Sequence, residues 1–204
     1  MARPDLGEQL GEPAREYALA SLHQLAAVDR AVYAAIASTP TPALDEPMRR
    51  LSTAANYSRI WLGVAAVLAT AGGRPGRRAA ARGVLAIGAT SALVNLGVKS
   101  LWDRERPDRS GTRVPVGRHV RMPASTSFPS GHSASGFAFA TAVGHELPFL
   151  AVPLRCVAAA VAYSRVHTGV HYPADAIVGS IVGARTGHLV AGLADRIASR
   201  RQRA

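Results

Sequence analysis

The segment MPASTSFPSGHSASGFAFATAVG, residues Met122–Gly144, has no Asp, Glu, Lys or Arg in 23 residues, and His132 is its only titratable side chain. A helix needs roughly 20 predominantly apolar residues to cross the hydrocarbon core of a bilayer. Within the segment, Pro129, Ser130 and Gly131 resemble a helix start, because proline is favoured in the first helical turn. The segment is therefore typical of a membrane helix with a polar beginning.

Four further runs have the same character, since each contains at most one charged residue. They are Leu51–Gly73, Gly83–Val98, Leu147–Ser164 and Ala176–Ala194. Short polar segments separate the runs, and this spacing favours a polytopic membrane protein over a soluble alanine-rich helical bundle. We therefore predict an all-α fold, a membrane helical bundle of five to six transmembrane helices.

The sixth helix depends on residues Ala14–Ala37, which resemble a helix with several apolar side chains along one side. These side chains are Leu22, Leu25, Val32 and Ile36. Asp29 and Arg30 interrupt the segment, so it either lies at the membrane interface or crosses as a poorly hydrophobic span. A proline-rich break at Thr39–Pro47 ends it.

Glycine recurs at four-residue spacing in the last apolar run, at Gly179, Gly183 and Gly187. A stripe of small residues allows membrane helices to approach closely. A chain rich in alanine and glycine also produces such a stripe by composition alone, so both interpretations stay open.

Arginines gather in two clusters, one between the first two apolar runs and one after the last. The clusters are Arg74, Arg77, Arg78 and Arg82, and Arg196, Arg200, Arg201 and Arg203. The positive-inside rule places both clusters in the cytoplasm. It thereby predicts a multi-pass plasma-membrane protein with both termini cytoplasmic and the loop from Asp103 to about Ser127 on the extracytoplasmic side. We divide the chain into an N-terminal region (1–50), a membrane core (51–195) and a basic cytoplasmic tail (196–204).

The overall charge is strongly basic, with 24 Lys and Arg against 13 Asp and Glu, a net charge of +11. The cations lie in loops beside apolar runs and aromatic residues are only 5% of the chain, so we expect no nucleic-acid partner. A single cysteine, Cys156, excludes an internal disulfide and a multi-cysteine zinc site. The outer loop contradicts the positive-inside rule, because it contains six arginines. This exception indicates an anionic ligand. The six are Arg104, Arg106, Arg109, Arg113, Arg118 and Arg121.

Three short motifs fall at the outer-face ends of apolar runs. They are KSLWDRERP (Lys99–Pro107), FPSGHS (Phe128–Ser133) and SRVHTGVHYPAD (Ser164–Asp175). A phosphate dianion needs several fixed donors, which lysine and arginine side chains provide. A helix N-terminus adds backbone N–H groups and its dipole. The motifs therefore predict a phosphate site that includes Lys99, Arg106, Arg165, Ser130 and Gly131.

Two histidines, His132 and His171, lie within these motifs. A neutral imidazole can attack phosphorus to form a phosphohistidine, and a protonated one can donate to the leaving oxygen. Asp175 follows His171 by four residues, so on a helical turn its carboxylate can orient the imidazole. His167 and His171 have the spacing of a zinc-binding helix, but no glutamate accompanies them, and we expect no metal.

Together the three motifs resemble the signature of the type 2 phosphatidic acid phosphatase (PAP2) family, whose superfamily includes bacterial acid phosphatases and vanadium haloperoxidases. The family pattern is K-x6-RP, then PSGH, then SR-x5-H-x3-D. The chain meets it from about Leu51 to Ala194 at Lys99, Arg106, Pro107, Pro129–His132, Ser164, Arg165, His171 and Asp175.

The resemblance implies that His171 is the nucleophile, that Asp175 orients it and that His132 is the acid. It assigns phosphate binding to Lys99, Arg106, Ser130, Gly131 and Arg165, and it implies no metal and no other cofactor. It also implies a six-helix membrane bundle with the active site at the outer face.

The leading functional hypothesis is a metal-independent membrane lipid phosphatase that acts on a phosphomonoester or diphosphate through a phosphohistidine. Phosphatidic acid, phosphatidylglycerophosphate, polyprenyl diphosphate and a prenyl-linked sugar phosphate all present a suitable terminal phosphate. A vanadium-dependent haloperoxidase-type activity and a non-enzymatic anionic-lipid binder are the alternatives.

Overall fold

A computed structural model describes residues 12–99 and 103–203 of the chain. Within these ranges the regular structure is helical, which confirms the predicted all-α class. The longer helices are α2 (Glu12–Ser38), α3 (Pro42–Ala54), α4 (Arg59–Ala71), α5 (Gly73–Ala92), α7 (Gly131–Glu146), α8 (Ala151–His167) and α9 (Pro173–Arg203). The short turns are η1 (Asn56–Ser58), η2 (Leu93–Val98, a π-helical turn), η3 (Val116–Arg118) and η4 (Pro148–Leu150).

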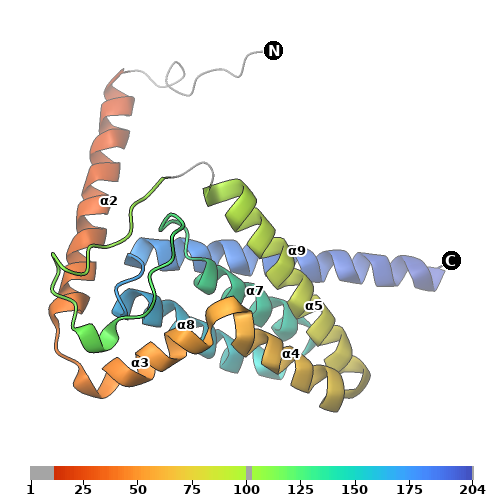
Figure 1. The fold of residues 1–204 in the computed structure, drawn as a ribbon. Coiled ribbons are helices and arrows are strands. Elements are labelled where there is room, and N and C mark those ends of the chain that lie inside the picture. The colour runs from red at the N-terminus through yellow and green to blue at the C-terminus, as the bar shows by residue number, and fades with distance from the viewer. Residues whose placement is uncertain (1–11, 100–102, 204) are drawn as a thin grey trace.

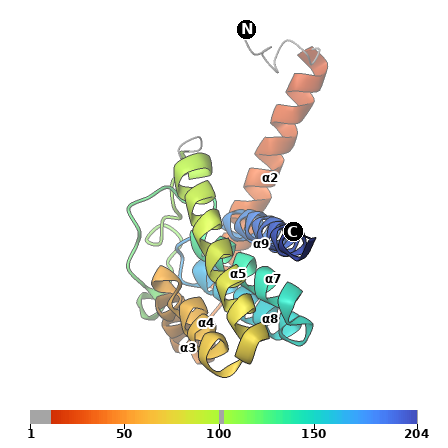
Figure 2. The same cartoon turned by 90° about the vertical axis from the view of Figure 1, so that its right-hand side faces the viewer.

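Helix α7 lies at the centre of the bundle, with α5, α8 and α9 around it (Figures 1 and 2). Its side chains are small and almost all buried from Ser133 to Gly144. Of its two phenylalanines, Phe139 is buried, and its ring packs on Trp61 of α4 at a centroid distance of 5.6 Å. The helix begins at Gly131 with Ser130 as its N-cap, which confirms the helix start predicted from the sequence.

The glycine stripe of α9 packs directly on the backbone of α7. A Cβ added at Gly183 would lie 2.0 Å from the carbonyl oxygen of Ala134, and one at Gly179 would lie 2.5 Å from that of Ser130. Gly187 makes the same approach one turn further along, at Ala138. The stripe is therefore a packing surface, and it holds α9 against the N-terminal end of α7.

We expect Gly183→Ala to destabilise the protein strongly, because the new methyl group would overlap backbone atoms that cannot move aside. The matched control is Gly192→Ala on the same helix, where an added Cβ meets nothing within 4 Å. Thermal unfolding in detergent measures both. Overpacking costs about 1–3 kcal/mol, whereas alanine at the open position gains helix propensity. Equal midpoints for the two variants would contradict the packing role.

Three helical segments among the described residues are long and apolar enough to cross a membrane: Gly73–Gly97, Pro148–His167 and Pro173–Arg200. Two predicted spans differ from expectation. Residues Leu51–Gly73 do not form one helix, because Tyr57 and Ser58 adopt left-handed backbone conformations that separate α3 from α4. The helical part of Met122–Gly144 begins only at Gly131, since the preceding nine residues form an irregular segment.

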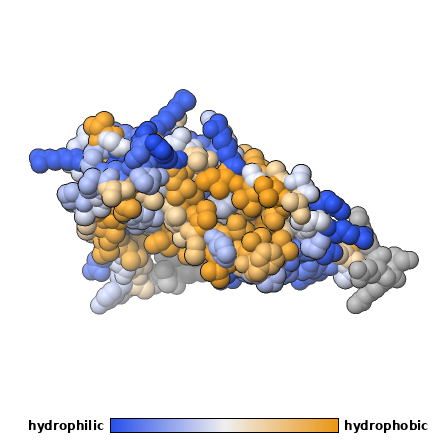
Figure 3. All heavy atoms as spheres, turned by 90° about the horizontal axis from the view of Figure 1, so that it is seen from below, coloured by the Kyte–Doolittle hydropathy of each residue, from blue (hydrophilic) through white to orange (hydrophobic). Residues whose placement is uncertain are grey.

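Apolar side chains gather in the middle of one face of the molecule. Figure 3 shows one face, with a hydrophobic band between hydrophilic ends. Exposed apolar residues include Leu62 and Val67 on α4, Val152 on α8, and Ile177 on α9. Such a continuous apolar band is rare on soluble monomers and marks a surface that contacts lipid or another protein.

The predicted N-terminal helix is confirmed as α2, although the proline-rich break is shorter than expected. Only residues 39–41 are non-helical, because Pro42 can begin α3, and Pro47 lies inside that helix. The first half of α2 extends away from the bundle (Figure 1). Its buried side chains near the bundle are Asp29, Tyr33 and Ala37, whereas Leu22, Leu25 and Val32 are exposed.

At the other end of the chain, α9 continues through Arg196 and Arg200 to Arg203. The basic segment 196–204 therefore continues the last helix as far as the structure describes it. Arginines of the first cluster likewise lie in the first turns of α5, which follows a tight turn at Gly72–Gly73.

Candidate active site

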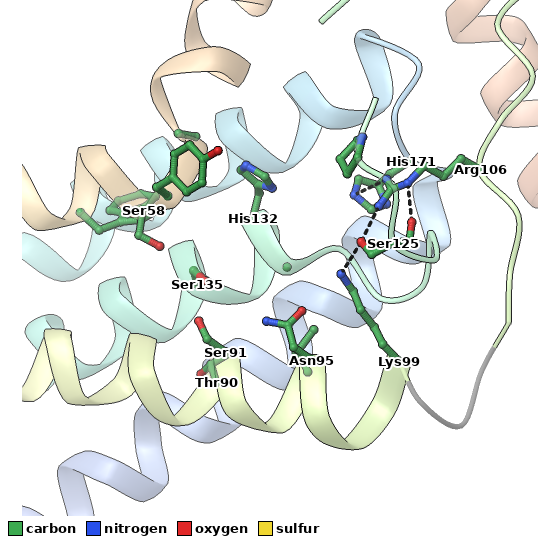
Figure 4. A pocket seen from close by; sticks show the side chains of 16 residues that line it. Ser58, Thr90, Ser91, Asn95, Lys99, Arg106, Ser125, His132, Ser135 and His171 are labelled. Carbon is green, nitrogen blue, oxygen red and sulfur yellow. Dashed lines mark hydrogen bonds between the residues drawn. The ribbon is translucent and has the colours of Figure 1, made fainter. Parts of the chain in front are cut away.

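A cavity of about 210 Å³ opens between α4, α5 and α7. Five of the residues predicted from the motifs line it, although they come from three distant parts of the sequence (Figure 4). They are Lys99, Arg106, Gly131, His132 and His171. The fold thus brings the three motifs to one place.

The two cations of the cavity face it without a carboxylate partner among the described residues. Lys99 Nζ donates to Ser125 Oγ at 3.1 Å. Arg106 is held by main-chain acceptors, with Nε on Ser125 O at 2.9 Å and Nη2 on Thr126 O at 3.0 Å. Burial, and then the charge of Arg106, lower the pKa of Lys99, and burial also lowers the pKa of Arg106. Two partly desolvated cations side by side favour an anion between them.

His171 presents one ring nitrogen to Arg106 and the other to a carboxylate. Arg106 Nη1 lies 3.3 Å from Nε2, and Asp175 Oδ2 lies 3.4 Å from Nδ1. A guanidinium only donates, so Nε2 accepts and Nδ1 carries the proton of the neutral ring. The Nε2 lone pair therefore faces the cationic end of the cavity, the geometry that an attacking nucleophile requires.

Asp175 is completely buried and is held by three donors besides His171. Ser127 Oγ and the backbone N–H of Tyr172, at 2.9 Å, both donate to Oδ2. Arg104 Nη1 donates to Oδ1 at 2.8 Å. These donors fix the carboxylate and keep it an acceptor for the imidazole.

Arg104 also links this site to α2. Its Nη2 donates to Asp29 Oδ2 at 2.6 Å, and the other oxygen of Asp29 accepts from the backbone N–H of Ala174 at 2.8 Å. Asp29 is 8% exposed. The sequence analysis missed Asp29, Arg104 and Ser127. The only signal for Asp29 was a carboxylate interrupting an otherwise amphipathic helix.

His132, at the N-terminal end of α7, is oriented by a residue of the turn between α3 and α4. Its Nε2 donates to Asn56 Oδ1 at 2.9 Å. Asn56 was also missed, although Asn-Tyr-Ser within an apolar run is a turn signal. The break in the predicted span Leu51–Gly73 thus has a consequence for the site, because it places Asn56 beside His132.

Two predicted phosphate ligands, Ser130 and Arg165, lie behind the cavity wall. Ser130 is fully buried, and its hydroxyl caps α7 by accepting from Ser133 Oγ at 3.0 Å and from Ser133 N at 3.4 Å. Arg165 is 2% exposed, its Nη1 donates to Ser52, and its Nε has no partner in the described structure. Arg165 therefore brings an incompletely neutralised charge close to the cavity without lining it.

Protein contacts account for three of the six arginines in the outer loop, Arg104, Arg109 and Arg118, so these three need no anionic ligand. Arg118 is fully buried, and its guanidinium bonds to Asp45 and Thr41 and to main-chain oxygens at the end of α2. Arg109 bonds to the carbonyls of Gly169 and Val120. Of the six arginines, all in the described structure, Arg106 alone lines the cavity.

Comparison with known proteins identifies the relatives of this chain. The family model of the PAP2 superfamily matches residues 80–197. A decaprenylphosphoryl-5-phosphoribose phosphatase of Mycobacterium tuberculosis is 39% identical over 111 residues, which cover 52% of this chain and 55% of that protein. The match thus spans about half the length of that curated relative. The protein of the same name from Mycolicibacterium smegmatis is 36% identical over 156 residues, covering 73% of this chain and 77% of that protein.

Two solved structures share the fold. One is the first transmembrane PAP2-type phosphatidylglycerolphosphate phosphatase from Bacillus subtilis, with a TM-score of 0.68 and 24% identity over 87% of this chain and 90% of that one. The other is Aquifex aeolicus LpxE, with a TM-score of 0.59 and 22% identity over 78% of this chain and 92% of that one.

Proposed function

Because this chain belongs to the PAP2 superfamily, we propose that it is a membrane lipid phosphatase that removes a terminal phosphate through a phosphohistidine intermediate. The observation that carries the proposal is the placement of His171. Its Nε2 faces the cations of the cavity, while its Nδ1 is backed by a buried carboxylate. That arrangement prepares a neutral imidazole to attack a bound phosphoryl group.

The proposed reaction has two steps. First, the lone pair of His171 Nε2 forms a bond to phosphorus as the ester P–O bond breaks, and the departing oxygen takes a proton from protonated His132. Second, water attacks phosphorus, its proton passes to His132, and the P–N bond breaks to release inorganic phosphate. Lys99 and Arg106 neutralise the charge on the transferring group in both steps. Protein cations alone supply this neutralisation, and the proposed chemistry requires no cofactor.

For the substrate, we propose the lipid-linked sugar phosphates as the first class to test among the four terminal phosphates considered above. The support is that both mycobacterial relatives are named for a decaprenylphosphoryl phosphoribose. The cavity of about 210 Å³ is below the roughly 300 Å³ of a pocket that encloses a drug-sized ligand. It therefore accommodates a headgroup, while the lipid chain remains outside in the apolar surroundings.

We propose that the cavity faces the extracytoplasmic side and that the arginine clusters face the cytoplasm. Ion pairs support the placement of both arginine clusters at the same end of the bundle. Arg82 of α5 contacts Asp195 of α9 at 2.7 Å, and Arg78 of α5 contacts Glu146 at the end of α7 at 2.8 Å. Helix α7 leads from this end to the cavity, and its 16 residues span about 24 Å. The two ends are thus separated by nearly the thickness of a hydrocarbon core.

The test is phosphate release by purified protein in detergent micelles from phosphatidic acid, phosphatidylglycerophosphate, a polyprenyl diphosphate and a prenyl-linked sugar phosphate. We expect turnover of at least one lipid, inhibition by vanadate and no loss of activity in EDTA. Loss in EDTA would contradict the metal-independent mechanism. Absence of turnover together with vanadate-dependent bromide oxidation would instead favour the haloperoxidase alternative.

The proposed nucleophile should stay neutral in mildly acidic solution. Burial, assisted by the charges of Arg106 and Arg165 and opposed by Asp175, lowers the pKa of His171 to about 4. At pH 6 only about one ring in a hundred is then protonated, compared with about three in four at an ordinary pKa near 6.5. Histidine-labelled protein, titrated by NMR and assigned with His171→Asn, should show no midpoint for His171 above pH 5. A midpoint near 6.5 would contradict this environment.

A further inference from the structure

The cavity has two chemically different ends, with His132 between them. Lys99, Arg106 and His171 gather on one side of His132, and the hydroxyl groups of Ser91 and Ser135 lie on the other (Figure 4). Ser58 and Thr90, which are also uncharged, lie on the hydroxyl side as well (Figure 4). Asn95 lies between the two ends, on the same wall as Ser91.

Several polar groups on this wall have no hydrogen-bond partner within the protein. Thr90 is 1% exposed, and its Oγ1 is buried and unpartnered in the described structure. The side chains of Ser91, Asn95 and Ser135 likewise make no hydrogen bond with any residue that the structure describes. The missing partner is a cost to the folded protein chiefly at Thr90, whose hydroxyl is buried, because Ser91 is partly exposed and Asn95 is exposed. The wall therefore offers a ligand one buried hydroxyl and several accessible donors and acceptors.

The polar residues Thr90, Ser91 and Asn95 of this wall lie on a helix that contains an irregular turn. After α5, residues Leu93–Val98 form a π-helical turn, a feature that occurs frequently at functional sites. The wider turn keeps Ser91, Asn95 and Lys99 on one face of the helix, directed into the same cavity (Figure 4). The polar wall and the phosphate-binding lysine are thus parts of one surface.

We propose that Thr90, Ser91, Asn95 and Ser135 form a subsite for a neutral, hydroxyl-bearing ring that carries the departing oxygen, such as a pentose. The proposal rests on the proposed phosphatase function. In that reaction the phosphoryl group lies against His171 and the departing oxygen lies at His132, so the leaving group extends from His132 along the wall of Asn95 and Ser91 toward the hydroxyl side. Neutral donors and acceptors there bind hydroxyl groups, whereas the second phosphate of a diphosphate would meet no cation among the lining residues described.

The experiment compares three lipids: a prenyl phosphoryl-pentose 5-phosphate and a prenyl diphosphate with the same prenyl chain, and phosphatidic acid as a lipid whose headgroup has no free hydroxyls. The variants are Asn95→Leu and Thr90→Val, which keep the branching and the number of side-chain heavy atoms and remove hydrogen bonding. We expect kcat/KM for the pentose phosphate to fall about tenfold in each. For phosphatidic acid the change should stay within about twofold, and the wild type should favour the pentose phosphate over the diphosphate.

The matched control is Thr141→Val, because Thr141 Oγ1 is also buried and unpartnered but does not line the cavity. This variant should leave kcat/KM unchanged for both the pentose phosphate and phosphatidic acid. Equal losses on the pentose phosphate and phosphatidic acid, or the same loss in Thr141→Val, would overturn the subsite. So would a wild-type preference for the diphosphate. A wild-type protein that turns over none of the three lipids would instead overturn the proposed function itself and the subsite with it.

Discussion

The His171→Ala variant should release phosphate from the lipid substrate at least about 10⁴-fold more slowly than the wild type, because no other group can form the covalent intermediate. The cations and the α7 N-terminus remain in this variant, so substrate binding should persist. Steady-state phosphate release and a binding assay with the same lipid measure the two effects separately.

The control is His188→Ala, since His188 is exposed on α9 and does not line the cavity. It should retain wild-type activity. Substrate carrying labelled phosphate adds an independent readout: the wild type should trap an acid-labile, base-stable label, as expected of a P–N bond, and His171→Ala should trap none. A variant with full activity, or one that traps the same label, would remove His171 as the nucleophile.

The Asp175→Asn variant should lower kcat by about 10³–10⁴-fold with little change in KM, by analogy with the loss of the orienting carboxylate in catalytic triads. The carboxylate accepts from His171, Ser127, Tyr172 and Arg104 in the native site. An amide cannot accept on all sides, so its NH₂ group faces either Arg104 or the ring. In the second orientation the proton moves to Nε2, and the lone pair no longer faces phosphorus.

The Arg104→Gln variant tests the same alignment without changing the carboxylate. We expect a smaller fall in kcat, about tenfold, because the guanidinium acts on Asp175 as a charge-assisted donor. Arg113→Gln is the matched control, since Arg113 is an exposed arginine of the same loop. NMR of His171 provides the readout that separates positioning from general stability: Arg104→Gln should shift its ring resonances, and Arg113→Gln should not. Unchanged resonances together with unchanged kcat would show that Arg104 is a structural link only.

Much of the site was predictable because its signals are local. The start of α7 at Gly131 follows from Pro129 and Ser130 as a helix beginning, and the reach of Asp175 to His171 follows from a four-residue separation. The motifs also specified five of the residues that line the cavity. Such features depend on neighbours within one helical turn, so periodicity and spacing carry them.

Where each helix begins and ends was harder to predict than which segments are helical. Low charge over Leu51–Gly73 is compatible with one helix, but packing of Trp61 and the contact of Asn56 with His132 accompany a sharp turn at residues 56–58. The hydrophobicity of a segment indicates that it is removed from water, but it does not indicate where the backbone bends. For the same reason, the apolar side chains of α2 did not indicate which of its faces would meet the bundle.

The sequence by itself determined the helical class, the three motifs and the chemistry that their residues can perform, because these depend on residue type and short spacing. The tertiary structure alone decided which groups support that chemistry. Asp29, Asn56 and Arg104 lie far in the sequence from the side chains that they contact. Arg118 is buried and binds Asp45 inside the protein. Hydrogen bonds between residues that are distant in sequence leave no periodic signal, so they appear only when packing brings their partners within about 3 Å.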